Sequence, residues 1–185
     1  MKKVLSLLVL ALVLTATYLW FNPSEQTDPS SADRELLPDY IAEQVTRTLY
    51  DEQGYVADLI QAGRLEFFER LGFTQFEQPK YTLFDEEHVA AWEVTSQFGI
   101  WLPDDKIILE QQVNIHNVNG NELIDRIDTD NLELLLPSRL LQTSAAVKII
   151  GKGFHINGIG LEADLTEQKL RIIKHLETVY ANEQN

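Results

Sequence analysis

The sequence predicts an all-β fold, an antiparallel sandwich or roll, preceded by a single N-terminal transmembrane helix. Two observations predict the β-domain: short runs rich in Val, Ile, Leu, Thr and aromatic residues recur after residue 38, and turn signals separate them every roughly 8 to 15 residues. A third observation predicts the helix, because no residue from 4 to 21 carries a charge.

The apolar run is long enough for one membrane crossing. At about 1.5 Å of rise per residue it spans roughly 27 Å, close to the hydrocarbon core of about 30 Å. It ends in the aromatic sequence 18–21, which is typical of a membrane interface, whereas a cleaved signal peptide ends in small residues. Lys2 and Lys3 precede it, which places the N-terminus in the cytoplasm. We therefore expect residues 1–21 to form a cytoplasmic start and an uncleaved anchor; a cleaved secretory signal is the alternative.

Residues 22–37 collect Pro, Ser and acidic side chains, which predicts a flexible tether outside the membrane. Residues 38–185 are enough for one domain with one core.

After the apolar run the chain carries 29 acidic residues but only 13 of its 15 basic ones. Such a charge disfavours nucleic acid and anionic membrane surfaces. The chain has no cysteine, which excludes disulfides and thiolate metal sites.

Several segments of the domain alternate with the period of a strand, among them 45–49 and 106–115. Segments 63–70 and 167–180 fit a helix or a strand, and we interpret the last as a strand with a possible helical turn. Four glycines lie between residues 151 and 165. They predict either a tight hairpin or a close approach by a partner strand.

The motifs of catalysis and metal binding are missing from the sequence. The four histidines are far apart and none has the spacing that places two imidazoles on one metal. There is no G-x-S-x-G motif, and the sequence 151–153 lacks the rest of a phosphate loop. The acidic run 85–87 is typical of a solvated turn. We therefore expect no catalytic residue, no metal site and no cofactor.

A β-roll that does not collapse fully leaves an apolar interior, and such interiors bind acyl chains. The negative charge of the domain predicts that a phosphorylated lipid headgroup would stay outside. The edge strands of an open roll expose unpaired backbone groups, to which another β-protein can add a strand.

From Pro38 to about Tyr180 the domain, together with the anchor and tether, resembles the LptC-type lipopolysaccharide export proteins of the Gram-negative inner membrane. The resemblance rests on an ordered set of short pieces: Tyr50, Gly54, 76–79, 84–85, 129–131, 151–153, Gly158, 160–161, 164–165 and 178–180. It implies a periplasmic antiparallel β-jellyroll and a non-catalytic role. In this role the protein receives lipopolysaccharide from an inner-membrane ABC transporter and passes it to a periplasmic jellyroll bridge protein by edge-strand pairing, toward the outer membrane.

The resemblance also implies site residues. Val45, Phe76 and Leu170 match lipid-contacting positions in the interior of the roll, although Leu170 is larger than the small residue the family can carry there. Gly151 and Tyr180 match positions at the C-terminal edge that meets the bridge protein. All five also fit a structural role, the first three as core residues. Two other functions stay open: a membrane-tethered periplasmic assembly adaptor that binds proteins but no lipid, and a periplasmic hydrolase.

Overall fold

The computed structural model describes residues 17–18, 37–85, 87–120, 122–136, 138–165 and 169–181. The chain divides into two units, Met1–Leu37 and Pro38–Asn185. Apart from residues 17, 18 and 37, the expected anchor and tether lie outside the described residues. Within the described part of the chain, no helix combines the length and apolarity that a membrane crossing needs.

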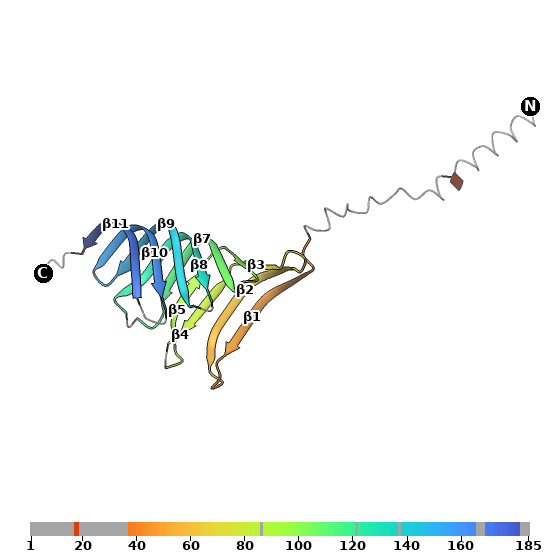
Figure 1. Ribbon diagram of the computed structural model, residues 1–185, viewed down its shortest axis with the longest axis horizontal. Coiled ribbons are helices and arrows are strands. Elements are labelled where there is room, and N and C mark those ends of the chain that lie inside the picture. The colour runs from red at the N-terminus through yellow and green to blue at the C-terminus, as the bar shows by residue number, and fades with distance from the viewer. Residues whose placement is uncertain are drawn as a thin grey trace, which may run out of the picture. The chain divides into compact units, whose positions relative to one another are not determined.

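The second unit is built from strands that join into one antiparallel sheet (Figure 1). The all-β antiparallel prediction is confirmed. The strands are β1 (Tyr40–Tyr50), β2 (Val56–Phe68), β3 (Phe73–Glu77), β4 (Lys80–Phe84), β5 (Ala90–Thr95), β6 (Phe98–Trp101), β7 (Lys106–Asn117), β8 (Ile124–Leu135), β9 (Leu140–Gly151), β10 (Phe154–Asp164) and β11 (Lys169–Tyr180).

Both ambiguous segments are strands. Most of segment 63–70 belongs to β2 and residues 169–180 form β11. The described part of the last segment, residues 169–180, contains no helical turn, because β11 pairs with β10 from Lys169 to Tyr180. The glycine-rich region begins as a tight hairpin, with residues 152 and 153 joining β9 to β10.

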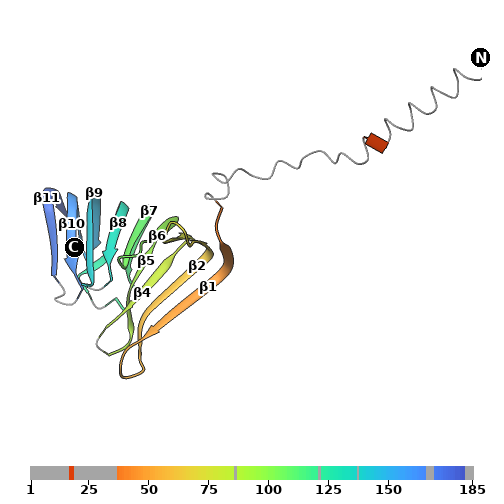
Figure 2. The ribbon, with the colours of Figure 1, turned by 45° about the vertical axis from the view of Figure 1, so that its right-hand side comes forward.

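The topology is a meander in which chain order and sheet order agree. β3 and β4 both pair with β2, and together they act as one kinked strand. β5 and β6 form a second kinked strand, because β4 pairs with β5, β3 pairs with β6, and both β5 and β6 pair with β7. From β7 to β11 each strand pairs with the next. Figure 2 shows the resulting progression from β1 at one end of the domain to β11 at the other.

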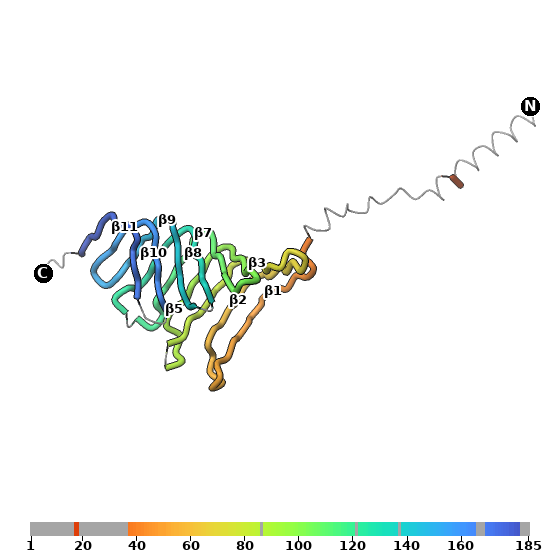
Figure 3. The backbone as a smooth tube through the Cα atoms, in the orientation of Figure 1, coloured from red at the N-terminus to blue at the C-terminus, as the bar shows by residue number. Residues whose placement is uncertain are grey.

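Most of the long strands are interrupted near the middle. Gln44 on β1, Gln78 between β3 and β4, Gln111 and Gln112 on β7, and Gly160 on β10 all have positive φ. A residue in this left-handed conformation breaks the extended backbone and bends the strand. Figure 3 shows the strands bending over rather than running straight.

The interruptions are neighbours across the sheet. Gln78 N–H donates to the Gln97 carbonyl at 2.8 Å, and Gln97 N–H donates to the Gln111 carbonyl at 2.9 Å. Shifts in register continue the row through β8, β9 and β10, at residues 130–131, 144–145 and 160. We call this row, residues 44, 78, 97, 111–112, 130–131, 144–145 and 160, the crease. It divides the sheet into a β3 side and a β4 side.

The core lies between the two sides of the crease. Buried side chains from both sides belong to one cluster, so the two sides face each other and form a roll. The β3 side contributes Leu109, Leu132, Leu134, Leu141 and Leu161, and the β4 side contributes Val94, Val113, Ile115, Ile127 and Ile149. Each such side chain stabilises the fold by about 1.5–3 kcal/mol relative to exposure. We call the sheet face that carries them the interior face.

Buried polar groups near the crease are hydrogen-bonded. The Thr129 hydroxyl donates to the Ala146 carbonyl at 2.9 Å, and the Thr143 hydroxyl donates to Asn131 Oδ1 at 2.7 Å. Among the described residues no buried side-chain nitrogen or oxygen lacks a partner. The bends therefore carry no cost from unsatisfied polar side chains.

Candidate functional site

Phe76 lies on the interior face near the β1 end of the roll. On β3 it pairs with Leu65 of β2 and with Gly99 of β6, and Gly99 in turn pairs with the core residue Leu109. Its side chain is 4% exposed. It is not part of the central core cluster, so it packs beside the core rather than in it.

Val45 and Leu170 lie on the interior faces of the two end strands. Val45 on β1 pairs with the buried Ala62, and Leu170 on β11 pairs with the buried Ala163. Leu170 is 37% exposed and Val45 is half-buried. The three predicted lipid contacts therefore share one face, but Val45 and Phe76 lie at its β1 end and Leu170 at its β11 end.

The centre of the interior between these ends is filled by side chains. Leu132 and Ile149, one from each side of the crease, are both 0% exposed. A chain-like ligand that runs from one end of the interior to the other would have to part these core contacts. The two half-buried ends are the places where apolar surface is accessible.

A polar group also lies on the interior face near the β1 end. The Tyr81 hydroxyl on β4 donates to Asp58 Oδ1 on β2 at 2.5 Å, and Arg139 Nη2, from the turn between β8 and β9, lies 3.7 Å from the same oxygen. Burial, and then the hydrogen bond to Asp58, raise the pKa of Tyr81 above its ordinary value of 10.0. Tyr81 is thus a neutral donor across the neutral pH range.

Arg47 adds a second guanidinium to this end of the interior. It pairs with the buried Ile60, so it points to the interior face, and its Cζ lies 4.4 Å from the ring centroid of Trp101 on the opposite side of the crease. Sequence reasoning missed Arg47. The signal was present, because Arg47 alternates in phase with Val45 and Leu49 and therefore belongs to the same face.

Gly151 and Tyr180 lie on one line across the C-terminal end of the sheet, because Phe154 pairs with both. Gly151 is buried, and a Cβ placed there would lie 2.3 Å from Phe154 Cζ and 2.5 Å from the Leu123 carbonyl oxygen. Packing within the chain therefore requires glycine here. Tyr180 is 74% exposed and lines a shallow hollow of about 440 Å³ with Phe154 and Val179.

The two end strands expose large apolar side chains. On β1 these are Tyr40, Ile41, Leu49 and Tyr50, and on β11 they are Leu170, Ile173, Leu176, Val179 and Tyr180. Within the described residues each of these strands pairs with one neighbour only, β1 with β2 and β11 with β10. Each therefore has a free edge with apolar side chains beside it, which is the arrangement that a further strand can join.

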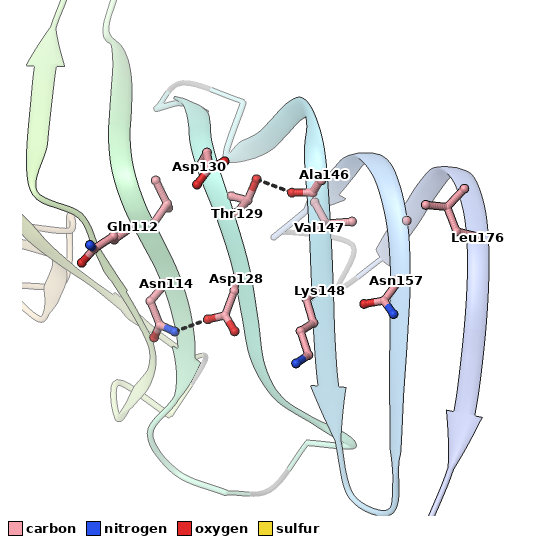
Figure 4. Close-up of a pocket in the computed structure, with 12 residues that line it drawn as sticks. Gln112, Asn114, Asp128, Thr129, Asp130, Ala146, Val147, Lys148, Asn157 and Leu176 are labelled. Carbon is pink, nitrogen blue, oxygen red and sulfur yellow. Dashed lines mark hydrogen bonds between the residues drawn. The ribbon is translucent and has the colours of Figure 1, made fainter.

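A broader groove of about 620 Å³ crosses β7 to β11 beside the crease (Figure 4). Polar side chains form a row along it: Asn114 Nδ2 donates to Asp128 Oδ1 at 2.6 Å, and Lys148 and Asn157 continue the row toward Leu176. Among the described residues, no group of three or more His, Asp or Glu side chains could hold a metal ion.

These features define a class: an all-β protein whose single sheet bends into a roll, with an apolar interior face and two free edge strands. Residues 8–181 match the family model described as lipopolysaccharide-assembly, LptC-related. The chain belongs to this family, and the resemblance found in the sequence is confirmed.

Two relatives and one solved structure are similar to this chain. The lipopolysaccharide export system protein LptC of Escherichia coli (strain K12) is 23% identical over 143 residues, which cover 77% of this chain and 75% of that protein. The LptC protein of Haemophilus influenzae is 21% identical over an alignment of 195 positions, with 93% and 92% coverage. The crystal structure of LptH, the LptA homologue of Pseudomonas aeruginosa, gives a TM-score of 0.48 at 11% identity and covers 62% of this chain and 80% of that one.

Proposed function

We propose that this protein is a non-catalytic component of lipopolysaccharide export, anchored in the inner membrane with a periplasmic domain of the jellyroll type. It receives lipopolysaccharide from an inner-membrane ABC transporter and passes it to a periplasmic bridge protein toward the outer membrane. The observation that carries the proposal is the family match over residues 8–181. The apolar interior face, accessible at both ends, supports a role for acyl chains, and the free edges of β1 and β11 support strand pairing with partners.

Lipid contact is tested by photo-crosslinking in cells with benzoylphenylalanine at Phe76. The matched control is Gln75, the adjacent residue on the same strand, whose side chain points to the opposite face. We expect lipopolysaccharide to be labelled from position 76 and not from position 75. Equal labelling from the two positions would rule out binding in the interior.

We assign the transporter to the β1 edge and the bridge protein to the β11 edge. This assignment is tested with the same crosslinker at two exposed tyrosines at opposite ends of the sheet. Tyr180 on β11 is 74% exposed and Tyr40 on β1 is 54% exposed. We expect the bridge protein to be captured from position 180 and transporter subunits from position 40. Capture of both partners from one position would contradict the assignment of one partner to each edge. A bulky substitution at Gly151 would not test the edge, because it would clash with Phe154 whatever its effect on a partner.

The packed centre of the roll favours a second candidate, an assembly adaptor that binds proteins but no lipid. Leu132 and Ile149, in the middle of the interior, are both fully buried. The adaptor predicts both partner crosslinks and no lipopolysaccharide label at position 76. The two experiments together therefore separate the candidates.

A further inference from the structure

Arg47 lies on the interior face, and no anionic side chain among the described residues forms an ion pair with it. Its guanidinium lies over Trp101, at 4.4 Å from the ring centroid. Arg126 on β8, by contrast, pairs with Asp128 at 3.2 Å. A guanidinium has five N–H donors, and contact with a ring face leaves them available.

Arg139 is only loosely paired. Its Nη2 lies 3.7 Å from Asp58 Oδ1, beyond the about 2.7–2.9 Å of a charge-assisted hydrogen bond. The same oxygen already accepts the Tyr81 hydroxyl at 2.5 Å. Asp58 therefore orients Arg139 but does not use its full donor capacity.

Both arginines approach Tyr81. Arg47 pairs with Ile60 of β2, which pairs with Tyr81 of β4, so Arg47 and Tyr81 lie on the same face two strands apart. Arg139 contacts the Asp58 oxygen that accepts the Tyr81 hydroxyl. The two arginines come from β1 and from the turn between β8 and β9, yet both lie close enough to the Tyr81 hydroxyl for their charges to lower its pKa against the larger effect of burial. The charged groups that act on Tyr81 are thus one carboxylate, Asp58, and two guanidiniums, which gives this end of the interior a local excess of positive charge, although the chain as a whole carries a net charge of −14.

We propose that Arg47 and Arg139 form an anion-binding subsite at the β1 end of the interior, which takes a phosphate group of a lipid headgroup. The inference rests on the proposed function, because the acyl chains of the same lipid would lie against Val45 and Phe76. Guanidinium groups bind phosphate through paired N–H donors. The contact of Arg47 with the Trp101 ring and the 3.7 Å contact of Arg139 with Asp58 do not occupy these donors fully. The subsite revises the expectation from net charge that the headgroup stays outside.

Binding is measured by ¹⁹F NMR on the full chain in detergent micelles, labelled with 5-fluorotryptophan. The chain has three tryptophans, and the Trp101 signal is assigned with Trp101→Phe. The probes are diphosphorylated lipid A and the same lipid without its phosphates. Because Arg47 contacts the Trp101 ring, its movement to a phosphate shifts the Trp101 signal.

We expect Arg47→Gln and Arg139→Gln each to weaken binding of the phosphorylated probe by about 10-fold or more, the loss typical of a charge-assisted hydrogen bond. Binding of the dephosphorylated probe should change less than twofold. Arg126→Gln removes the same charge from the outer face and is the matched control, with no expected change. For the two interior variants, an equal loss for both probes would overturn the subsite, because a packing role affects both lipids alike.

Two further measurements test the subsite independently of the arginine variants. Asp58→Asn removes the competing carboxylate, so the phosphorylated probe should bind more tightly; weaker binding would overturn the proposal even if an arginine variant unfolds. Inorganic phosphate alone should not saturate the Trp101 shift, and saturation would replace the lipid phosphate with free phosphate as the ligand. If the unmutated chain binds neither lipid, the proposed function itself is wrong.

Discussion

At three glycines near the C-terminal end of the sheet, an added methyl group would meet different obstacles: an unfavourable backbone conformation, a close contact with a neighbouring side chain, or both. Gly153 has φ +81° and a Cβ there meets nothing within 4 Å. Gly158 has no positive φ, but its Cβ would lie 2.6 Å from Ile172 Cγ2. Gly160, in the crease, has both problems, with φ +74° and a Cβ 2.9 Å from the Cβ of Ile173. Alanine at these positions therefore tests backbone conformation, packing and their sum.

The expected losses follow from these distances. A left-handed backbone costs an L-residue about 1–2 kcal/mol, so Gly153→Ala should lower the free energy of unfolding by about that amount. An added methyl in a packed site costs about 1–3 kcal/mol, which we expect for Gly158→Ala. Gly160→Ala combines the two and should cost about 2–5 kcal/mol. It should thus be the most destabilising of the three.

The assay is urea unfolding of the full chain in detergent, followed by the far-ultraviolet circular dichroism of the sheet. Ile172→Ala removes the Cγ2 atom that Gly158→Ala would meet, so the double variant should be more stable than the sum of the single losses predicts. Equal losses at all three glycines would refute the reasoning. So would a loss at Gly160 no larger than that at Gly153, because the contact with Ile173 would then carry no cost.

Three further predictions concern the core, the interior hydroxyl and the crease. Ile149→Ala should lower the free energy of unfolding by about 2–5 kcal/mol, measured by urea titration, because Ile149 is fully buried. Since the pKa of Tyr81 in the folded protein is raised above 10.0, the stabilisation by Tyr81 is complete below about pH 10 and is lost as pH rises further. Tyr81→Phe should abolish this alkaline loss of stability in thermal melts. At pH 7 the same substitution should lower the free energy of unfolding by about 1–3 kcal/mol, because it removes the donor to Asp58. Gln111→Gly should preserve or raise the melting temperature and Gln111→Val should lower it, because Gln111 has φ 63°.

Strand alternation was sufficient to predict the β-fold and its turns. The residues of 106–115 alternate as expected on both sides of Gln111 and Gln112, and those two residues are where the strand bends. The crease was not predicted, because glutamine carries no conformational signal that marks it as left-handed. Its position becomes visible only when neighbouring strands are set in register, which is long-range information.

The site, like the fold, could be predicted only in part from the sequence. The resemblance placed Val45, Phe76 and Leu170, and the structure puts all three on the interior face, where their contact with lipid stays a prediction. The grouping of Asp58, Tyr81 and Arg139 could not be read from the chain, because the three come from β2, β4 and a turn beyond β8. β2 and β4 pair directly, whereas Arg139 reaches Asp58 only because the sheet bends.

The agreement of chain order with sheet order has a consequence for assembly. In a meander, each strand docks on the edge left by the one before it, and no later segment has to thread between strands already in place. The edge of β11 is thus equivalent to the edge that every earlier strand offered to its successor. A strand from another molecule that pairs with β11 would extend the sheet in the same way as each strand of this chain extends it. One continuous sheet can therefore run across several chains.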